Sequence, residues 1–153
     1  MARKATCNQL HPNPDRVQIA GLAAMHCPPI NLGQFSRLKH FAIHTENRPP
    51  VIVSWLADSL RYLGAGNSLR SLTVFSGGSV IWDGRAWAKL DSVISGRRFE
   101  VGKFDGIKIE ITTDVQFTEA VELFSSRLPK TNEKKLLKVV AVSPCSHFLR
   151  SCH

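Results

Sequence analysis

The sequence has no long apolar run and few cysteines for its length. Its 153 residues contain nothing near the roughly 18 consecutive apolar residues of a membrane-spanning helix, and residues 1–15 lack the apolar segment of a cleaved signal. The cysteines form no C-x-x-C pair and are too few for a disulfide-rich scaffold: Cys7, Cys27, Cys145 and Cys152. We therefore expect free thiols in an intracellular protein, cytoplasmic or nuclear, that does not act at a membrane.

Dense clusters of basic residues are also absent, although the net charge is +8. Lysine and arginine occur singly or in pairs, such as Arg97-Arg98 and Lys134-Lys135. No segment alternates aromatic and basic residues in the way of a platform that stacks single-stranded bases. A weakly basic, solvated surface is the simplest interpretation, and we expect no nucleic-acid partner.

Motifs for catalysis and for metal binding are missing as well. The Gly-Gly-Ser at 77–79 lacks the closing glycine of a nucleophile elbow, and the Gly-Ala-Gly at 64–66 lacks the third glycine of a dinucleotide loop. His40 and His44 are four residues apart on a predicted strand, which separates them by about 13 Å, too far to bind one metal ion. The sequence therefore predicts no enzymatic activity and no cofactor.

A short apolar pattern recurs about every 33 residues. Its four copies are Leu38-x-x-Phe41-x-Ile43, Leu69-x-x-Leu72-x-Val74, Phe104-x-x-Ile107-x-Ile109 and Leu137-x-x-Val140-x-Val142. The last positions of these copies are separated by 31, 35 and 33 residues. Each copy has the alternation of a half-buried strand. A strand repeated at a near-constant period is typical of a solenoid, in which neighbouring units share a core.

The segments between the strands show helical periodicity. We predict helices over 51–63, from Asp83 to the residues before Gly96, and over 113–128, where Pro129 ends the last one. Asp91 is expected at the surface or as a helix cap, and the tryptophans are expected to pack in the core: Trp55, Trp82 and Trp87. Nearer the N-terminus, Val17-Gln18-Ile19 is compatible with an extra strand, and 17–25 equally with a short helix.

The predicted order is β-α-β-α-β-α-β over about 37–143. Right-handed crossovers make such strands parallel. With all helices on one face, the fold is an α/β, short leucine-rich-repeat-like solenoid, and the alternative is a small open α/β sheet. We divide the chain into 1–34, an irregular N-terminal cap or poorly ordered segment, 35–143, the repeat-like domain, and 144–153, a C-terminal tail.

Side chains that alternate with the predicted core positions would lie on the opposite, concave side of the sheet. The candidate partner-binding residues are His40, His44, Ser71, Thr73, Phe75, Lys108, Glu110 and Thr112, with Ala42, Ala141 and Ser143 on the same predicted side. Phe75 has two interpretations. It is either an aromatic anchor for a partner or a residue tucked under the Gly77-Gly78 loop.

Three blocks resemble those of a known family. They are W-x-x-L-D-x-x-I-x-x-x-x-F from Trp87 to Phe99 before the strand at Ile107, Leu128-Pro129 before Leu136-Leu137-Lys138-Val139, and Leu69-x-x-Leu72-x-Val74. Over 35–142 the chain resembles the leucine-rich-repeat-like C-terminal region of F-box-type proteins from mushroom-forming fungi. In F-box proteins the repeats hold the substrate of a ubiquitin ligase, and an N-terminal helical module docks on the ligase adaptor. No such module is visible in 1–34.

The leading hypothesis is accordingly a protein–protein interaction module, in the family's terms the substrate-recognition part of an F-box-like ubiquitin ligase receptor. Its partner would be another protein. Two alternatives stay open. One is a small α/β enzyme or small-molecule binder with its site at the carboxyl ends of the strands. The other is a degenerate repeat remnant without retained activity.

Overall fold

Five parallel strands lie side by side in the order of the sequence. A computed structural model of the chain describes residues 15–19, 28–35, 37–45, 49–64, 66–76, 84–99, 103–112 and 117–142. Within them the sheet has the order β1-β2-β3-β4-β5. The elements are β1 (Arg16–Ile19), η1 (Leu32–Gln34), β2 (His40–His44), α3 (Pro49–Leu60), β3 (Ser71–Ser76), α4 (Gly84–Ile94), β4 (Gly106–Thr112), α5 (Phe117–Arg127), α6 (Pro129–Glu133) and β5 (Leu137–Val142).

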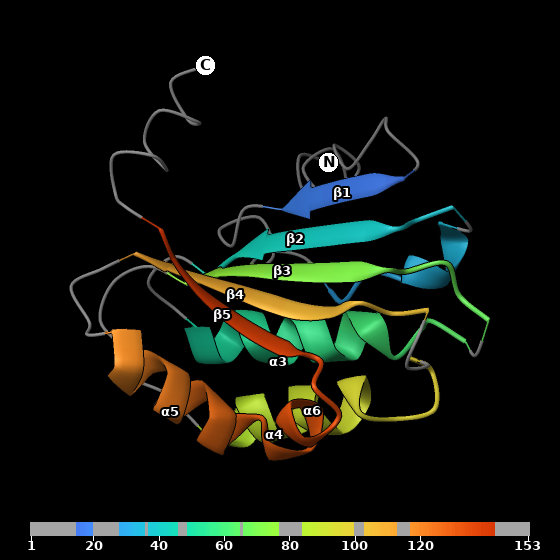
Figure 1. Ribbon diagram of the computed structural model, residues 1–153. Helices are drawn as coiled ribbons and strands as arrows, with labels where there is room; N and C mark the ends of the chain where they lie inside the picture. The colour runs from blue at the N-terminus through green and yellow to red at the C-terminus, as the bar shows by residue number, and fades with distance from the viewer. Residues whose placement is uncertain are drawn as a thin grey trace.

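The helices α3, α4, α5 and α6 lie on one side of the sheet (Figure 1). The helices α3 and α4 each connect two adjacent parallel strands, and α5 and α6 together connect β4 to β5; crossovers of the same hand carry successive helices to the same face. The prediction of an α/β fold with parallel strands alternating with helices is confirmed. An open α/β sheet, the second architecture that the sequence allowed, also fits this arrangement.

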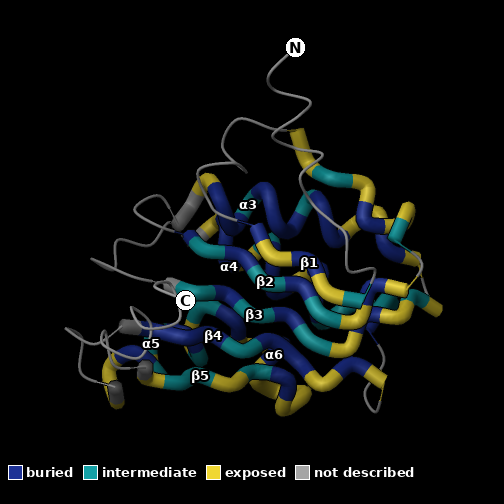
Figure 2. The backbone as a smooth tube through the Cα atoms, turned by 90° about the horizontal axis from the view of Figure 1, so that it is seen from above, coloured by how far each residue is buried: buried dark blue, intermediate teal, exposed yellow. Residues whose placement is uncertain are grey.

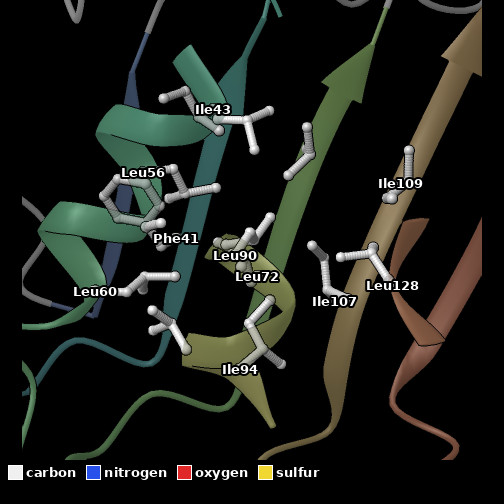
Figure 3. Close-up of a cluster of buried hydrophobic side chains, with 14 of the residues drawn as sticks. Phe41, Ile43, Leu56, Leu60, Leu72, Leu90, Ile94, Ile107, Ile109 and Leu128 are labelled. Carbon is white, nitrogen blue, oxygen red and sulfur yellow. The ribbon is translucent and has the colours of Figure 1, made fainter. Parts of the chain in front are cut away.

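The core lies between the sheet and the helices. Strand register aligns Phe41, Leu72 and Ile107 in one row across the sheet, and a second row follows two residues later. Both rows are buried, as predicted, and along β2 and β3 buried and half-buried positions alternate (Figure 2). Side chains from the helices meet these rows (Figure 3), namely Leu56, Leu60, Leu90, Ile94 and Leu128.

Tryptophans contribute to this core from the helical side. Trp87 is fully buried and meets Phe124 of α5 edge to face, with ring centroids 5.2 Å apart. Trp55 on α3 is also buried. Their predicted packing role is confirmed, and Trp82 lies outside the described residues.

The predicted phase of the last strand is wrong by one residue. Leu137 pairs with Ile107 and Val139 with Ile109, so these two continue the core rows, whereas Val140 pairs with Glu110 on the other face. The helix-facing assignment of Val140 is therefore incorrect. The same register places Val142 beside Thr112, outside the core rows, and Ala141 beside the buried Ile111, so the assignments of these two residues were also reversed.

The described residues before position 35 share the sheet and the core. Val17 and Ile19 are buried in β1, which pairs in parallel with β2, so the strand alternative for this segment is confirmed. The following segment is fastened to α3 by two hydrogen bonds. Trp55 Nε1 donates to the carbonyl of Pro28 over 3.1 Å, and the amide of Ile30 donates to Ser59 Oγ over 3.0 Å.

The helical predictions hold for α3, α4 and α5, with one omission. The helix α5 ends at Arg127, just before Pro129, as predicted, but Pro129 also begins a further helix, α6, which was not predicted. Asp91 is not at the surface: it is buried on α4, and its carboxylate caps α6. The capping half of that prediction is thus confirmed and the surface half is wrong.

Several predictions concern residues that the structure does not describe. These are the four cysteines, Ser143, the helix starts expected near Asp83 and Thr113, and the Gly77-Gly78 loop.

Candidate binding face

The sheet surface turned away from the helices carries mostly polar side chains. We call it the outer face and define it by Arg16, Gln18, His40, Ala42, His44, Ser71, Thr73, Phe75, Lys108, Glu110, Lys138 and Val140. Strand register arranges these residues in rows. Arg16, His40 and Ser71 lie side by side, the next row runs from Gln18 to Lys138, and a third contains His44, Phe75, Glu110 and Val140.

A groove of about 690 Å³ is hollowed over strands β1 to β4 of this face. Seven of the eight predicted partner-binding residues line it: His40, His44, Ser71, Thr73, Phe75, Lys108 and Glu110. The eighth, Thr112, is on β4 beyond Glu110, and its side chain is not described. The structure therefore brings the predicted residues together, and their role in binding stays a prediction.

Two residues of the groove were missed by sequence reasoning. Arg16 and Gln18 extend it onto β1. The sequence left the secondary structure around Val17 open, so no face was assigned to its neighbours. Strand alternation on either side of Val17 and Ile19 was the signal that pointed to them.

Hydrogen bonds between adjacent strands hold both histidines of the groove. His40 Nδ1 and Ser71 Oγ share a bond of 2.6 Å, and the amide nitrogen of Gln18 lies 2.9 Å from His44 Nε2. Each bond joins side chains from neighbouring strands. The imidazoles are therefore oriented before any ligand arrives, which reduces the side-chain conformational entropy that is lost on binding.

His44 and Phe75 form an aromatic pair at the carboxyl end of the groove. Their ring centroids are 4.3 Å apart and the ring planes differ by 11°. One face of the Phe75 ring is thus covered by the imidazole, and the phenyl group is half-buried. A partner would meet the exposed edges of this pair.

The charged side chains of the outer face differ in how deeply they are buried. Glu110 is only 6% exposed, and Lys108 Nζ lies 3.7 Å from its Oε1. Phe75 and Val140 flank Glu110 in the register, so the carboxylate sits between two apolar side chains. A buried carboxylate needs a countercharge, and Lys108 supplies one.

Within the described ranges, no group of three or more His, Cys, Asp and Glu side chains is arranged to hold a metal ion. In that same part of the chain, no helix is both long and apolar enough to cross a membrane.

No protein-family model, curated protein or solved structure matches this chain. The resemblance to the repeat region of fungal F-box-type proteins stays a prediction.

Proposed function

We propose that this chain is a protein-binding module and that the outer face is its contact surface. The groove across β1 to β4 is the observation that carries the proposal. It collects hydrogen-bonding side chains from four strands, those of β2 and β3 half-buried, with the His44–Phe75 pair at one end. Polar groups that are ordered beforehand, next to an aromatic residue, are what a protein partner uses for specificity and affinity.

The finer architecture that we propose is a short leucine-rich-repeat-like solenoid. A repeated hydrogen-bond pattern at the start of the strands supports it. The amides of Lys39 and His40 donate to the carbonyl of Asp15, and one unit later those of Arg70 and Ser71 donate to the carbonyl of Lys39. Equivalent bonds between successive units are expected where each unit stacks on the previous one.

A second inter-unit contact supports the same architecture. Asn67 Nδ2 donates to the carbonyl of Gly64 over 2.7 Å and to that of Arg98, in the next loop, over 2.8 Å. One side chain thereby joins two consecutive connections between helix and strand.

In terms of the family resemblance, the module would recognise the substrate of an intracellular F-box-like ubiquitin ligase receptor. The residues that would meet the substrate are those of the groove, and no catalysis by this chain is required. In this role the chain should be recovered from cells together with a ligase adaptor.

Affinity capture from cells, followed by mass spectrometry, tests the proposal when three forms of the full chain are compared. Thr73→Trp places a large uncharged side chain in the middle of the groove, because Thr73 lies on the outer face of β3, and so blocks it whatever the charge of the partner. Ser92→Trp adds the same side chain to an exposed position of α4, on the helical side, and is the matched control.

We expect a set of proteins that the unchanged chain and Ser92→Trp both retain and that Thr73→Trp loses. A ligase adaptor within the retained set would support the F-box role. Identical recovery with both tryptophan variants would exclude the outer face as the contact surface, provided that circular dichroism shows all three forms folded.

A further inference from the structure

Positive charge exceeds negative charge on the outer face. Its cations are Arg16 on β1, Lys108 on β4 and Lys138 on β5. Its one carboxylate among the described residues is Glu110, which is buried and faces Lys108. Arg16 and Lys138 are exposed, so their charges are available to a ligand. The charge of the buried Glu110 is largely neutralised within the protein.

The three cations are distributed across the sheet and not along any strand. Arg16 and Lys138 lie four strand spacings apart, about 19 Å, and Lys108 is one spacing, about 5 Å, from Lys138. A ligand that runs parallel to the strands would pass either Arg16 alone or the neighbouring pair Lys108 and Lys138, but not all three. A ligand that crosses the strands passes all three.

We infer that the partner presents an acidic segment in an extended conformation and that this segment crosses the strands from Arg16 to Lys138. The inference rests on the proposed function of the outer face. An extended chain advances about 3.3 Å per residue, so roughly six residues cover the distance between the two outer cations. Carboxylates at positions i, i+4 and i+6 point to the same side of such a segment and match Arg16, Lys108 and Lys138 in order.

The aromatic pair favours a peptide over a single-stranded nucleic acid. Bases bind to such surfaces by stacking on aromatic ring faces. One face of Phe75 is already covered by His44, at a centroid distance of 4.3 Å and an angle of 11°, and on its other side the register neighbour is the carboxylate-bearing Glu110. Peptide carboxylates need no ring face, because charge-assisted hydrogen bonds to arginine and lysine hold them.

Fluorescence anisotropy with the full chain tests the inference. The probe is a labelled peptide of about twelve residues, with Glu at i, i+4 and i+6 in a background of Ser and Ala. A peptide with Lys at the same positions and an oligothymidylate of similar length are the competing probes. The charge variant is Arg16→Gln/Lys138→Gln, and Lys108 is kept because it neutralises the buried Glu110.

The matched control is Arg97→Gln/Lys130→Gln, which removes the same charge from exposed residues outside the groove. We expect the charge variant to weaken binding of the Glu peptide about tenfold and the control to change it less than about twofold. Because Lys138 lies on an edge strand, size-exclusion chromatography must show that each variant is still monodisperse.

Equal weakening in the two double variants, or failure of the unchanged chain to bind the Glu peptide, would overturn the inference. So would binding of the Lys peptide or the oligothymidylate as tight as that of the Glu peptide. If Thr73→Trp nevertheless abolishes capture of proteins from cells, the outer face is the contact surface and only the acidic segment is wrong. If Thr73→Trp leaves capture unchanged, the proposed function fails together with the inference.

Discussion

The carboxylate of Asp91 on α4 holds the start of α6 through Thr131. Asp91 Oδ1 accepts hydrogen bonds from the amide of Thr131 over 2.8 Å and from its Oγ1 over 2.7 Å, and Oδ2 accepts one from the amide of Lys130 over 3.2 Å. Asp91 and Thr131 are 3% and 0% exposed. Leu128, the residue before α6, makes no side-chain cap bond. The capping group of this helix is therefore supplied by another helix, forty residues earlier in the chain.

Replacement of this carboxylate should destabilise the fold. Asp91→Ala leaves two backbone amides and a buried hydroxyl without their acceptor, and we expect a loss of about 2–4 kcal/mol in the free energy of unfolding. Asp91→Asn keeps one acceptor oxygen and should lose less. Urea unfolding followed by circular dichroism measures both.

Asp58→Ala is the control for this prediction. Asp58 pairs with Lys89 over 2.6 Å at a partly exposed site on the helices, where an ion pair contributes less than about 1 kcal/mol. An Asp91→Ala protein as stable as Asp58→Ala would show that the cap of α6 is not a stabilising contact.

Gly106 should not tolerate a side chain. Its φ is +120°, a conformation that L residues rarely adopt, and an added Cβ would overlap the carbonyl oxygen of Leu136, which also accepts the amide of Ile107 over 2.7 Å. We expect Gly106→Ala to cost about 2–4 kcal/mol, because the backbone is strained and the pairing of β4 with β5 is disturbed. Thermal unfolding measures the loss. Gly64→Ala, where a Cβ meets nothing within 4 Å, should change stability by less than about 1 kcal/mol, and equal effects at the two glycines would contradict the close approach.

Asn67 should tie neighbouring loops together. Besides its two donated bonds, its Oδ1 accepts the amide of Leu69 over 3.1 Å. We expect Asn67→Ala to lower stability by about 1–2 kcal/mol. Amide exchange at Leu69 should accelerate more than exchange in the middle of β3. Uniform acceleration over the whole sheet would indicate global destabilisation and not a local tie.

Phe75 should matter more for binding than for stability. Its ring is half-buried, so we expect Phe75→Ala to cost about 1–2 kcal/mol of folding free energy, less than a core phenylalanine. A double-mutant cycle with His44→Ala should give a coupling of about 0.5–1.5 kcal/mol from the stacked pair. If Phe75→Ala still captures the partner with unchanged affinity, Phe75 is not an anchor.

The regular part of the fold could be predicted because each inner strand is apolar on one side only. In β2 and β3, Phe41 and Ile43 or Leu72 and Val74 alternate with residues that are polar or small, except Phe75, and this alternation sets the face. The last strand offers no such signal. Leu136, Leu137, Val139, Val140 and Val142 are apolar on both sides of the chain, and only pairing with β4 decides which of them face the helices. The residues that correspond across the sheet are Phe41, Leu72, Ile107 and Leu137, which are separated by 31, 35 and 30 residues.

The residues of the candidate site could be predicted where alternation along one strand places them. They could not be predicted where their position depends on contacts with a distant segment of the chain. Ser71 and Lys108 follow from alternation alone. The inclusion of Arg16 depends on the pairing of a four-residue strand with β2, and α6 depends on a cap from Asp91. Such long-range contacts leave no local pattern in the sequence.

Because the strands lie in the order of the sequence, we expect the sheet to open from one edge. Among the described residues, each strand pairs only with the strands next to it in sequence, so detachment of β5 breaks pairing with β4 alone and leaves the pairing of β1 to β4 intact. The core side chains Leu137 and Val139 are half-buried on this edge, whereas Val17 and Ile19 of β1, the other edge strand, are buried, so by burial the β5 edge is the weaker of the two. Cooperative opening would then begin at β5 and move inward, so that protection of the backbone amides rises from β5 to β3.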